Sequence, residues 1–328
     1  MKLVTTPALP SLTPVAAGED TESAVPLRIG VVQHRWREDP EELTTSLDDA
    51  IGQAADAGAR VVFLPELTLS RYPADVRAGE EPDALAEDLE DGPTYAFAAR
   101  AAAAHGVHVH ASLYRRARDA SSPDDRRGLN TAILVSPAGD LVALTDKLHI
   151  PVTTGYYEDT WFRPGAATDP YPVHRVGGLD DLRVGMPTCW DEWFPEVARA
   201  YALGGAELVV YPTAIGSEPD YPDFDTQPLL RTVVTAHGIT AGTFMVVPNR
   251  TGDEGTVRFY GSSFVSDPYG RVLVEAPRDE EAVLVTDVAR EQRRDWLTLF
   301  PFLRTRRPDT YDVLTRPVDA EHPFGGGR

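Results

Sequence analysis

Three residues at the ends of apolar segments have the side chains that nucleophilic acyl transfer requires. Cys189, the one cysteine of the chain, follows an apolar strand expected over 183–188. Glu66 ends a short apolar run, and Lys147 follows a strand expected over 141–145. A thiol, a carboxylate and an ammonium can serve as nucleophile, proton shuttle and oxyanion stabiliser where they converge. We therefore predict that these three side chains form one catalytic site.

Each of the three residues also has an ordinary structural interpretation. A lone cysteine is often buried and inert, a glutamate after a strand often caps a helix or faces solvent, and a lysine is usually solvated. Lys147 stands out because Lys2 is the only other lysine among 31 basic residues. Cys189 follows a strand and precedes a helix, a turn at which α/β proteins bind ligands and helix amides favour a thiolate. Together these features favour the functional interpretation.

Strands alternate with helices along the chain, which indicates an α/β protein. Helices are expected from Pro40 to Gly58, over 95–104, from Pro195 to Gly204 and over 229–241. Strands are expected over 27–33, 60–64, 107–113, 130–136, 141–145, 183–188, 207–211, 244–248, 261–267 and 271–275. We predict one domain over 26–315, a flexible N-terminal extension over 1–25 and a flexible C-terminal tail over 316–328.

Composition excludes several classes of protein. The 328 residues are 42% hydrophobic with a formal net charge of −20, which argues against nucleic-acid and membrane partners and favours a neutral or cationic small-molecule ligand. One cysteine excludes an intrachain disulfide. No stretch approaches the roughly 20 apolar residues that span a membrane, and no signal peptide is recognisable. We expect a cytoplasmic protein.

Motifs of other enzyme classes are missing. The sequence has no Gly-x-Gly-x-x-Gly turn, no Gly-Lys-Ser/Thr loop and no Gly-x-Ser-x-Gly elbow, so a nucleotide-binding protein or a serine hydrolase is disfavoured. His108 and His110 can place two imidazoles on one face of a strand, but no further ligand cluster supports a metal site. The glycosylation sequon at Asn249 is attributed to chance.

Three segments together resemble the signatures of the nitrilase superfamily of carbon–nitrogen hydrolases. They are Leu64-Pro65-Glu66-Leu67, Asp146-Lys147-Leu148-His149-Ile150-Pro151 and Cys189-Trp190-Asp191-Glu192-Trp193-Phe194-Pro195-Glu196, in the family's order and spacing. The resemblance spans about residues 27–315. It implies a four-layer α-β-β-α sandwich, a Glu66–Lys147–Cys189 triad, and Glu158 as the family's second glutamate. It also implies no metal or organic cofactor, and a homodimer or larger even homo-oligomer.

Within the superfamily the chain most resembles N-carbamoylputrescine amidases, in the segments 211–219, 259–264 and 306–311. This likeness implies hydrolysis of N-carbamoylputrescine to putrescine, carbon dioxide and ammonia. We predict that Tyr156, Trp190, Glu218 and Ala214 bind the substrate, with Glu218 pairing with a distal ammonium. A nitrilase, an aliphatic amidase or an N-carbamoyl amino acid hydrolase using the same triad is the alternative.

Overall fold

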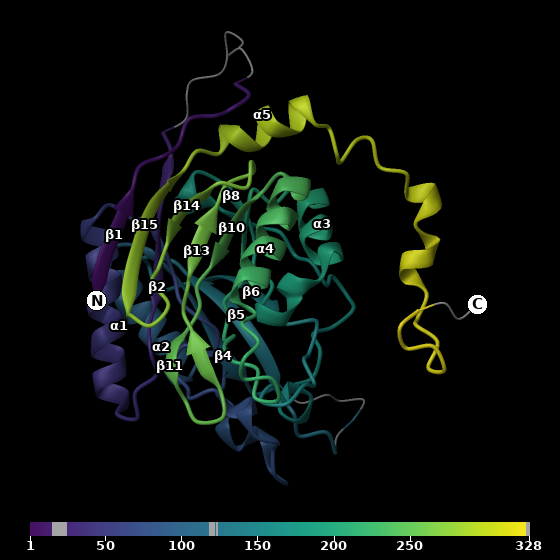
Figure 1. Cartoon of the computed structure of the whole chain (residues 1–328). Coiled ribbons are helices and arrows are strands. Elements are labelled where there is room, and N and C mark those ends of the chain that lie inside the picture. The colour runs from purple at the N-terminus through teal and green to yellow at the C-terminus, as the bar shows by residue number, and fades with distance from the viewer. Residues whose placement is uncertain (15–24, 118–121, 123, 326–328) are drawn as a thin grey trace.

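The computed structural model describes residues 1–14, 25–117, 122 and 124–325, and it contains two large sheets flanked by helices (Figure 1). The first sheet has the strand order β1-β15-β2-β3-β4-β5-β6, and the second has the order β14-β13-β10-β9-β8-β7. The first sheet comprises β1 (Lys2–Thr6), β2 (Leu27–Gln33), β3 (Val61–Phe63), β4 (His108–Arg115), β5 (Leu129–Val135), β6 (Leu141–Asp146) and β15 (Ala282–Val288). The second comprises β7 (His174–Val176), β8 (Leu182–Gly185), β9 (Leu208–Val210), β10 (Phe244–Val247), β13 (Phe264–Ser266) and β14 (Val272–Glu275). β11 (Thr251–Asp253) and β12 (Arg258–Tyr260) pair separately.

Helices begin and end where local sequence signals place them. Asp39 caps α1 (Pro40–Asp56) by accepting the N–H of Glu41 at 2.9 Å, as the Asp-Pro pair predicts. α2 (Pro93–His105) ends at Gly106, whose φ of +68° suits a residue without a Cβ. The remaining α-helices are α3 (Pro195–Leu203), α4 (Gln227–Ala241) and α5 (Glu291–Leu299).

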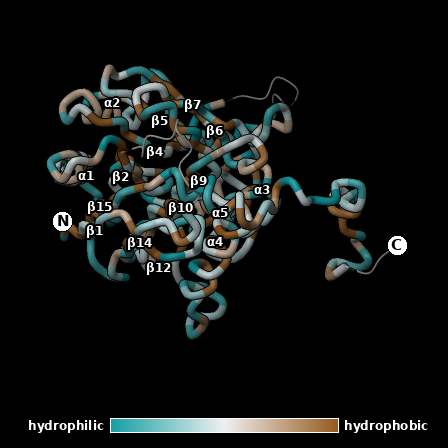
Figure 2. The backbone as a smooth tube through the Cα atoms, turned by 90° about the horizontal axis from the view of Figure 1, so that it is seen from above, coloured by the Kyte–Doolittle hydropathy of each residue, from teal (hydrophilic) through white to brown (hydrophobic). Residues whose placement is uncertain are grey.

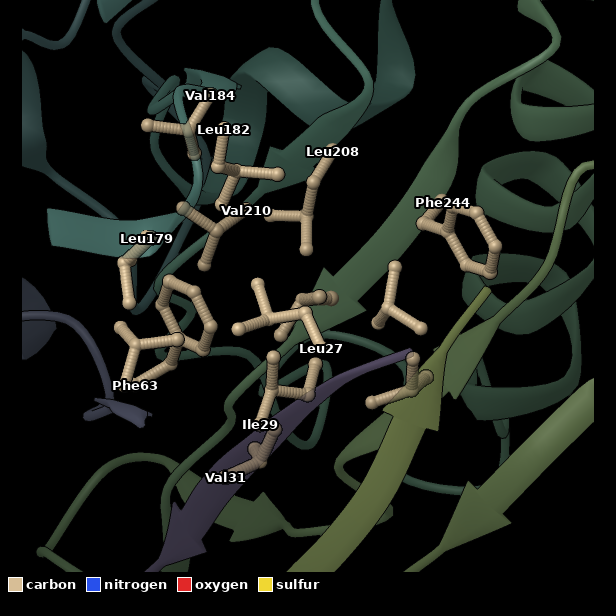
Figure 3. Close-up of a cluster of buried hydrophobic side chains, with 14 of the residues drawn as sticks. Leu27, Ile29, Val31, Phe63, Leu179, Leu182, Val184, Leu208, Val210 and Phe244 are labelled. Carbon is tan, nitrogen blue, oxygen red and sulfur yellow. The ribbon is translucent and has the colours of Figure 1, made fainter. Parts of the chain in front are cut away.

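Three buried apolar clusters define four layers. Side chains from both sheets meet in the largest cluster, which includes Ile29 and Phe63 from the first sheet and Val184 and Val210 from the second (Figure 3). A second cluster joins the outer face of the first sheet to α1 and α2, and a third joins the second sheet to α3 and α4. The predicted α-β-β-α sandwich is therefore confirmed, and the layers run from α1 to α3 across Figure 1.

The N-terminus differs from the prediction of a flexible extension. Lys2–Thr6 form β1, which pairs in parallel with β15 at the edge of the first sheet. The prediction is wrong for these residues because main-chain pairing with β15, rather than apolar burial, orders this short strand. Residues 15–24 lie outside the described residues. Within the described chain, no helix is long and apolar enough to cross a membrane.

The chain beyond α5 projects away from the sandwich, and both views show this segment apart from the two sheets (Figures 1 and 2). Over 300–325 it forms only short 3₁₀ turns, at Pro308–Thr310 and Asp312–Thr315. Several of its apolar side chains are exposed to solvent, namely Phe300, Val313, Leu314, Val318 and Phe324.

Candidate active site

The predicted triad residues all come from segments that follow strands of the two facing sheets. Glu66 lies three residues after β3 ends, and Lys147 directly follows β6, where its N–H still donates to the carbonyl of Asn130 at 2.8 Å. Cys189 begins a 3₁₀ turn (Cys189–Trp193) soon after β8. Glu66, Lys147 and Cys189 are at most 5% exposed. The sandwich thus brings chemistry from both sheets to one buried location.

The Lys147 ammonium bridges two carboxylates. Its Nζ donates to Glu66 Oε1 at 2.8 Å and to Glu158 Oε2 at 2.6 Å. Burial lowers the pKa of Lys147, but the charges of Glu158 and Glu66 outweigh burial and raise that pKa well above its usual value. Lys147 is therefore a fixed positive charge, suited to stabilising an anion that forms beside it.

Glu66 keeps one oxygen free for chemistry. Its Oε1 accepts hydrogen bonds from Lys147 and from Asn130 Nδ2, the latter at 2.7 Å. Its Oε2 is buried and has no hydrogen-bond partner among the described residues. An orphaned carboxylate oxygen next to a thiol is the arrangement that a general base requires.

Cys189 is held in a left-handed backbone conformation with a φ of +45°, which costs a residue with a side chain about 1 kcal/mol or more. Its N–H donates to the carbonyl of Pro212 at 3.0 Å, so that amide is not available to a thiolate. Burial raises the pKa of the thiol well above its usual value, and the negative charge of Glu66 raises that pKa further. The positive charge of Lys147 lowers it, but by less. The expectation of a helix-stabilised thiolate is therefore wrong: the resting group is a thiol that needs a base.

Glu158 connects the triad to a residue that the sequence did not single out. Glu158 lies in a 3₁₀ turn (Glu158–Thr160), and Tyr72 Oη donates to its Oε1 at 2.8 Å. Burial raises the pKa of Glu158 to about 7, although Lys147 lowers it. Tyr72 is fully buried. No local sequence signal marks Tyr72 as a site residue.

A cavity of about 90 Å³ opens above the thiol. Its lining residues are Pro151, Thr153, Tyr156, Glu158, Cys189, Trp190, Ile215 and Glu218. Three of the four predicted substrate-binding residues, Tyr156, Trp190 and Glu218, are thus placed around it. Ala214 is fully buried in an apolar cluster with Tyr156 and does not line the cavity, whereas its neighbour Ile215 does.

Tyr156 holds the loop that leads to Glu218 through two hydrogen bonds. The Tyr156 hydroxyl accepts the N–H of Gly216 at 2.9 Å and donates to the carbonyl of Ser217 at 3.1 Å. Glu218 itself is half-buried, and burial raises its pKa. The cavity therefore has an acidic side chain at a fixed position away from the thiol.

Two further motifs have structural roles. His110 is fully buried beside Phe63, and among the residues that the structure describes no three His, Cys, Asp or Glu side chains group as metal ligands would. Asn249 is also buried; its amide donates to the carbonyl of Gly261 at 2.8 Å and its oxygen accepts the N–H of Ile215 at 3.1 Å. Its sequon is inaccessible to modification in the folded chain.

Comparisons with known proteins agree with this architecture. The model of the carbon-nitrogen hydrolase family matches residues 28–297. The matched range includes Glu66, Lys147 and Cys189. The chain belongs to the carbon–nitrogen hydrolase family, within the nitrilase superfamily, and is an amidase-like hydrolase.

Similar proteins include a citrullinase and an N-carbamoylputrescine amidase. The chain is 32% identical over 297 residues to a citrullinase from Francisella tularensis subsp. tularensis, covering 88% of this chain and 98% of the relative. It is 30% identical over 298 residues to an N-carbamoylputrescine amidase from Arabidopsis thaliana, covering 87% and 94% respectively. The solved carbon-nitrogen hydrolase from Helicobacter pylori G27 superposes with a TM-score of 0.77 at 28% identity, covering 89% of this chain and 98% of that one.

Proposed function

We propose that the chain hydrolyses the C–N bond of a small linear carbamoyl compound through a covalent intermediate on Cys189. Glu66 Oε2 takes the thiol proton as sulfur attacks the carbonyl carbon, because it is the unpartnered carboxylate oxygen of the cluster. Lys147 and the backbone N–H of Trp190 stabilise the oxyanion. A well-placed donor of this kind contributes about 3–4 kcal/mol to the transition state.

Collapse of the tetrahedral intermediate expels the amine, or ammonia, which leaves with the proton held by Glu66. A carbonyl–sulfur bond remains, a thiocarbamate when the substrate is a ureido compound. Water, deprotonated by Glu66, then attacks the same carbon and restores the thiol. If the amine left first, the carbamate released decomposes to carbon dioxide and ammonia; if ammonia left first, the N-alkylcarbamate released decomposes to carbon dioxide and the amine. Glu158 orients Lys147 throughout, which their 2.6 Å contact supports.

N-carbamoylputrescine is the proposed substrate, and the charge of the cavity lining is the observation that supports it. Besides Glu158, the only charged side chain that lines the cavity is Glu218, and no arginine or lysine is among the described lining residues. An acid in the cavity lining attracts a substrate ammonium and repels a substrate carboxylate.

Citrulline is the second candidate because the citrullinase from Francisella tularensis is about as similar to this chain as the N-carbamoylputrescine amidase from Arabidopsis thaliana. Citrulline has the same ureido end but adds a carboxylate beside its ammonium. The lining offers that carboxylate no cationic partner within the described chain. The proposal therefore favours the diamine derivative, whose product would place the enzyme in polyamine biosynthesis.

A substrate panel tests the proposal. Purified protein is incubated with N-carbamoylputrescine, citrulline, N-carbamoyl-β-alanine and an aliphatic nitrile, and ammonia release is measured, with Cys189→Ala as the inactive control. The highest kcat/KM should belong to N-carbamoylputrescine. Preference for citrulline or N-carbamoyl-β-alanine would overturn the substrate, and consumption of the nitrile alone would overturn the amidase mechanism.

We also propose that the chain assembles as a homodimer or a larger even homo-oligomer. The exposed apolar side chains of the segment 300–325, which extends from the sandwich, support this because burial against a second copy would remove them from water. Light scattering at micromolar concentration should give an even multiple of 35.8 kDa. A monomer alone would contradict the proposal. The cytoplasmic location stays a prediction.

A further inference from the structure

A buried carboxyl group three residues after the nucleophile has no part in the mechanism above. Glu192 belongs to the same 3₁₀ turn as Cys189 and is fully buried, yet it does not line the substrate cavity. Its neighbour across the turn is Thr213, which follows β9 and is also fully buried. A buried acid without a cation or a hydrogen-bond donor is costly, so its protonation state needs an explanation.

Hydrogen-bond donors and acceptors around Thr213 identify that state. The Thr213 hydroxyl has one hydrogen and lies 2.7 Å from the carbonyl of Tyr211 and 3.4 Å from Glu192 Oε2. A carbonyl can only accept, so the shorter contact takes the hydroxyl hydrogen. The longer contact is then favourable only if the Glu192 carboxyl has a proton and donates it to the threonine oxygen. The other oxygen, Oε1, has no partner among the described residues, as a neutral acid tolerates better than an anion.

Charges around Glu192 favour the same state. Burial raises the pKa of Glu192 well above its usual value, and the negative charge of Glu66 raises that pKa further. The positive charge of Lys147 lowers it, but by less. Lys147 is already engaged by Glu66 and Glu158, at 2.8 and 2.6 Å. Asp191, in the same turn, adds a further negative charge that raises the pKa of Glu192.

The titratable groups packed against the turn from other elements supply no compensating cation. His237 of α4 is largely buried, and burial lowers its pKa, so it is neutral near pH 7. Tyr211, after β9, and Tyr260, of β12, have pKa values that burial raises well above the usual range. Each of these groups is neutral where the enzyme would work, so among the described residues they add no counter-charge to that of Lys147, which is already paired with two carboxylates.

We propose that Glu192 is a positioning residue that holds the Cys189 turn in place as a neutral carboxylic acid. The turn is attached to the segment after β9 at two points, Cys189 N–H to Pro212 O at 3.0 Å and Glu192 to Thr213. These contacts support the left-handed backbone of Cys189, whose φ is +45°. This inference rests on the proposed nucleophilic role of Cys189. Loss of the proton from Glu192 would break the second attachment and add negative charge beside the thiol.

Glu192→Gln and Glu192→Leu separate this role from simple packing. The amide of glutamine donates a hydrogen bond to Thr213 and cannot ionise, whereas leucine fills similar space without a donor. Leucine should lower kcat by about tenfold to a hundredfold, since misplacement of a reacting group costs that much. Glutamine should restore kcat near pH 7 and shift or abolish the decline of activity at alkaline pH. Thermal unfolding of both variants shows whether the fold is retained.

Infrared difference spectroscopy tests the protonation state without any substrate. The spectrum of wild type minus Glu192→Gln at pH 7 should contain the carbonyl stretch of a protonated carboxylic acid, which shifts in heavy water. A difference spectrum showing only ionised carboxylate bands would overturn the proposal. So would a leucine variant with unchanged kcat, or a glutamine variant with the wild-type alkaline decline. Failure of the proposed substrate leaves the infrared result unaffected, so the two proposals fail separately.

Discussion

Tyr72 and Glu158 form a buried hydrogen bond of 2.8 Å, from the tyrosine hydroxyl to Glu158 Oε1. Because Glu158 Oε2 accepts from Lys147, both oxygens of this carboxylate are fixed, one by a neutral donor and one by a cation. Lys147 is in turn fixed between Glu158 and Glu66. The position of the ammonium, and hence of the oxyanion beside it, therefore depends on Tyr72.

Removing the Tyr72 hydroxyl should weaken catalysis without unfolding the chain. The bond from Tyr72 lowers the pKa of Glu158, so Tyr72→Phe should raise that pKa and move the acid limb of kcat to higher pH. A hydrogen bond to a charged group contributes enough that kcat at pH 7 should fall about tenfold. Steady-state kinetics from pH 5 to 9 measures both effects. Tyr95→Phe, which removes a bond to the carbonyl of Gly139, is the matched control; equal losses in both variants would contradict the role of Tyr72.

Glu158→Gln tests the ionised form directly. In wild type, kcat should rise as the pH increases through about 7, where Glu158 loses its proton and holds Lys147 as an ion pair. Glutamine keeps the shape but not the charge, so kcat should fall about a hundredfold with a smaller change in KM, and the rise near pH 7 should disappear. A variant with full kcat would show that Lys147 needs only Glu66.

Periodicity and turn residues predicted most of the sandwich because each layer buries one face of its elements. α1 follows from an N-terminal proline and a glycine near its end, and β2 and β5 from apolar runs. For α2 the closing glycine was recognised, but the helix begins at Pro93, two residues before the predicted start. β1 was not predicted, since its Leu3 is exposed and its order comes from pairing with β15. β7, β11 and β12 were also missed because three residues are too few to show a period. β15 was missed although it is an apolar run of seven residues, like β2.

The residues of the site were also predicted only in part. Glu66, Lys147 and Cys189 were predicted because a nucleophile, a base and a cation after three strands form a recognisable set. Tyr72 and Asn130 were not, since each contributes one hydrogen bond that only the folded chain creates. Asp146, beside Lys147, forms a salt bridge with Arg115 at 2.8 Å, another contact that only the folded chain creates.

Acid should destabilise the chain through its buried histidines. Burial lowers the pKa of His110 to about 3 and, together with Arg250, that of His34 to about 4. Above about pH 6.5 these imidazoles are neutral in both the folded and the unfolded chain. As the pH falls below that value, they bind protons in the unfolded chain but not in the folded chain, so the free energy of unfolding decreases. Between pH 6.5 and 5, His110→Leu should lose about 2 kcal/mol less unfolding free energy than wild type. Urea denaturation measures this.

His322→Gln is the control for the histidine experiment because His322 is exposed near the C-terminus. It should keep the wild-type dependence on pH. If the free energy of unfolding changed equally with pH in wild type and His110→Leu, His110 would be protonated in the folded chain. Burial would then not control its charge.

Deleting residues 2–24 should lower stability more than activity. β1 covers the edge of β15, and the side chain of Gln292 donates to the carbonyl of Leu9 at 2.7 Å, so the described part of this segment is attached to the sandwich. The melting temperature should fall by about 5 °C, while kcat at 25 °C changes less than about twofold, because no cavity-lining residue is removed. Deletion of 316–328 is the control, and a large loss of kcat on removing 2–24 would mean that the segment contributes to the site.

Glu218→Gln should change substrate choice rather than chemistry. Glu218 lines the cavity with Tyr156 and Trp190, two rings able to flank an alkyl chain and add a cation–π contribution of about 0.5–2 kcal/mol. Glutamine removes the charge that would pair with a distal ammonium, so kcat/KM for N-carbamoylputrescine should fall about tenfold to a hundredfold, mainly through KM.

N-butylurea, which has the same ureido end and chain length but no charge, is the control substrate. The Glu218→Gln variant should hydrolyse it as well as the wild type does. Asp220→Asn, an exposed acid two residues further on, controls for general charge. Equal losses of kcat/KM on both substrates would mean that Glu218 has a structural role. No loss on either substrate would mean that Glu218 faces solvent and does not bind the substrate, whose ammonium would then be bound elsewhere.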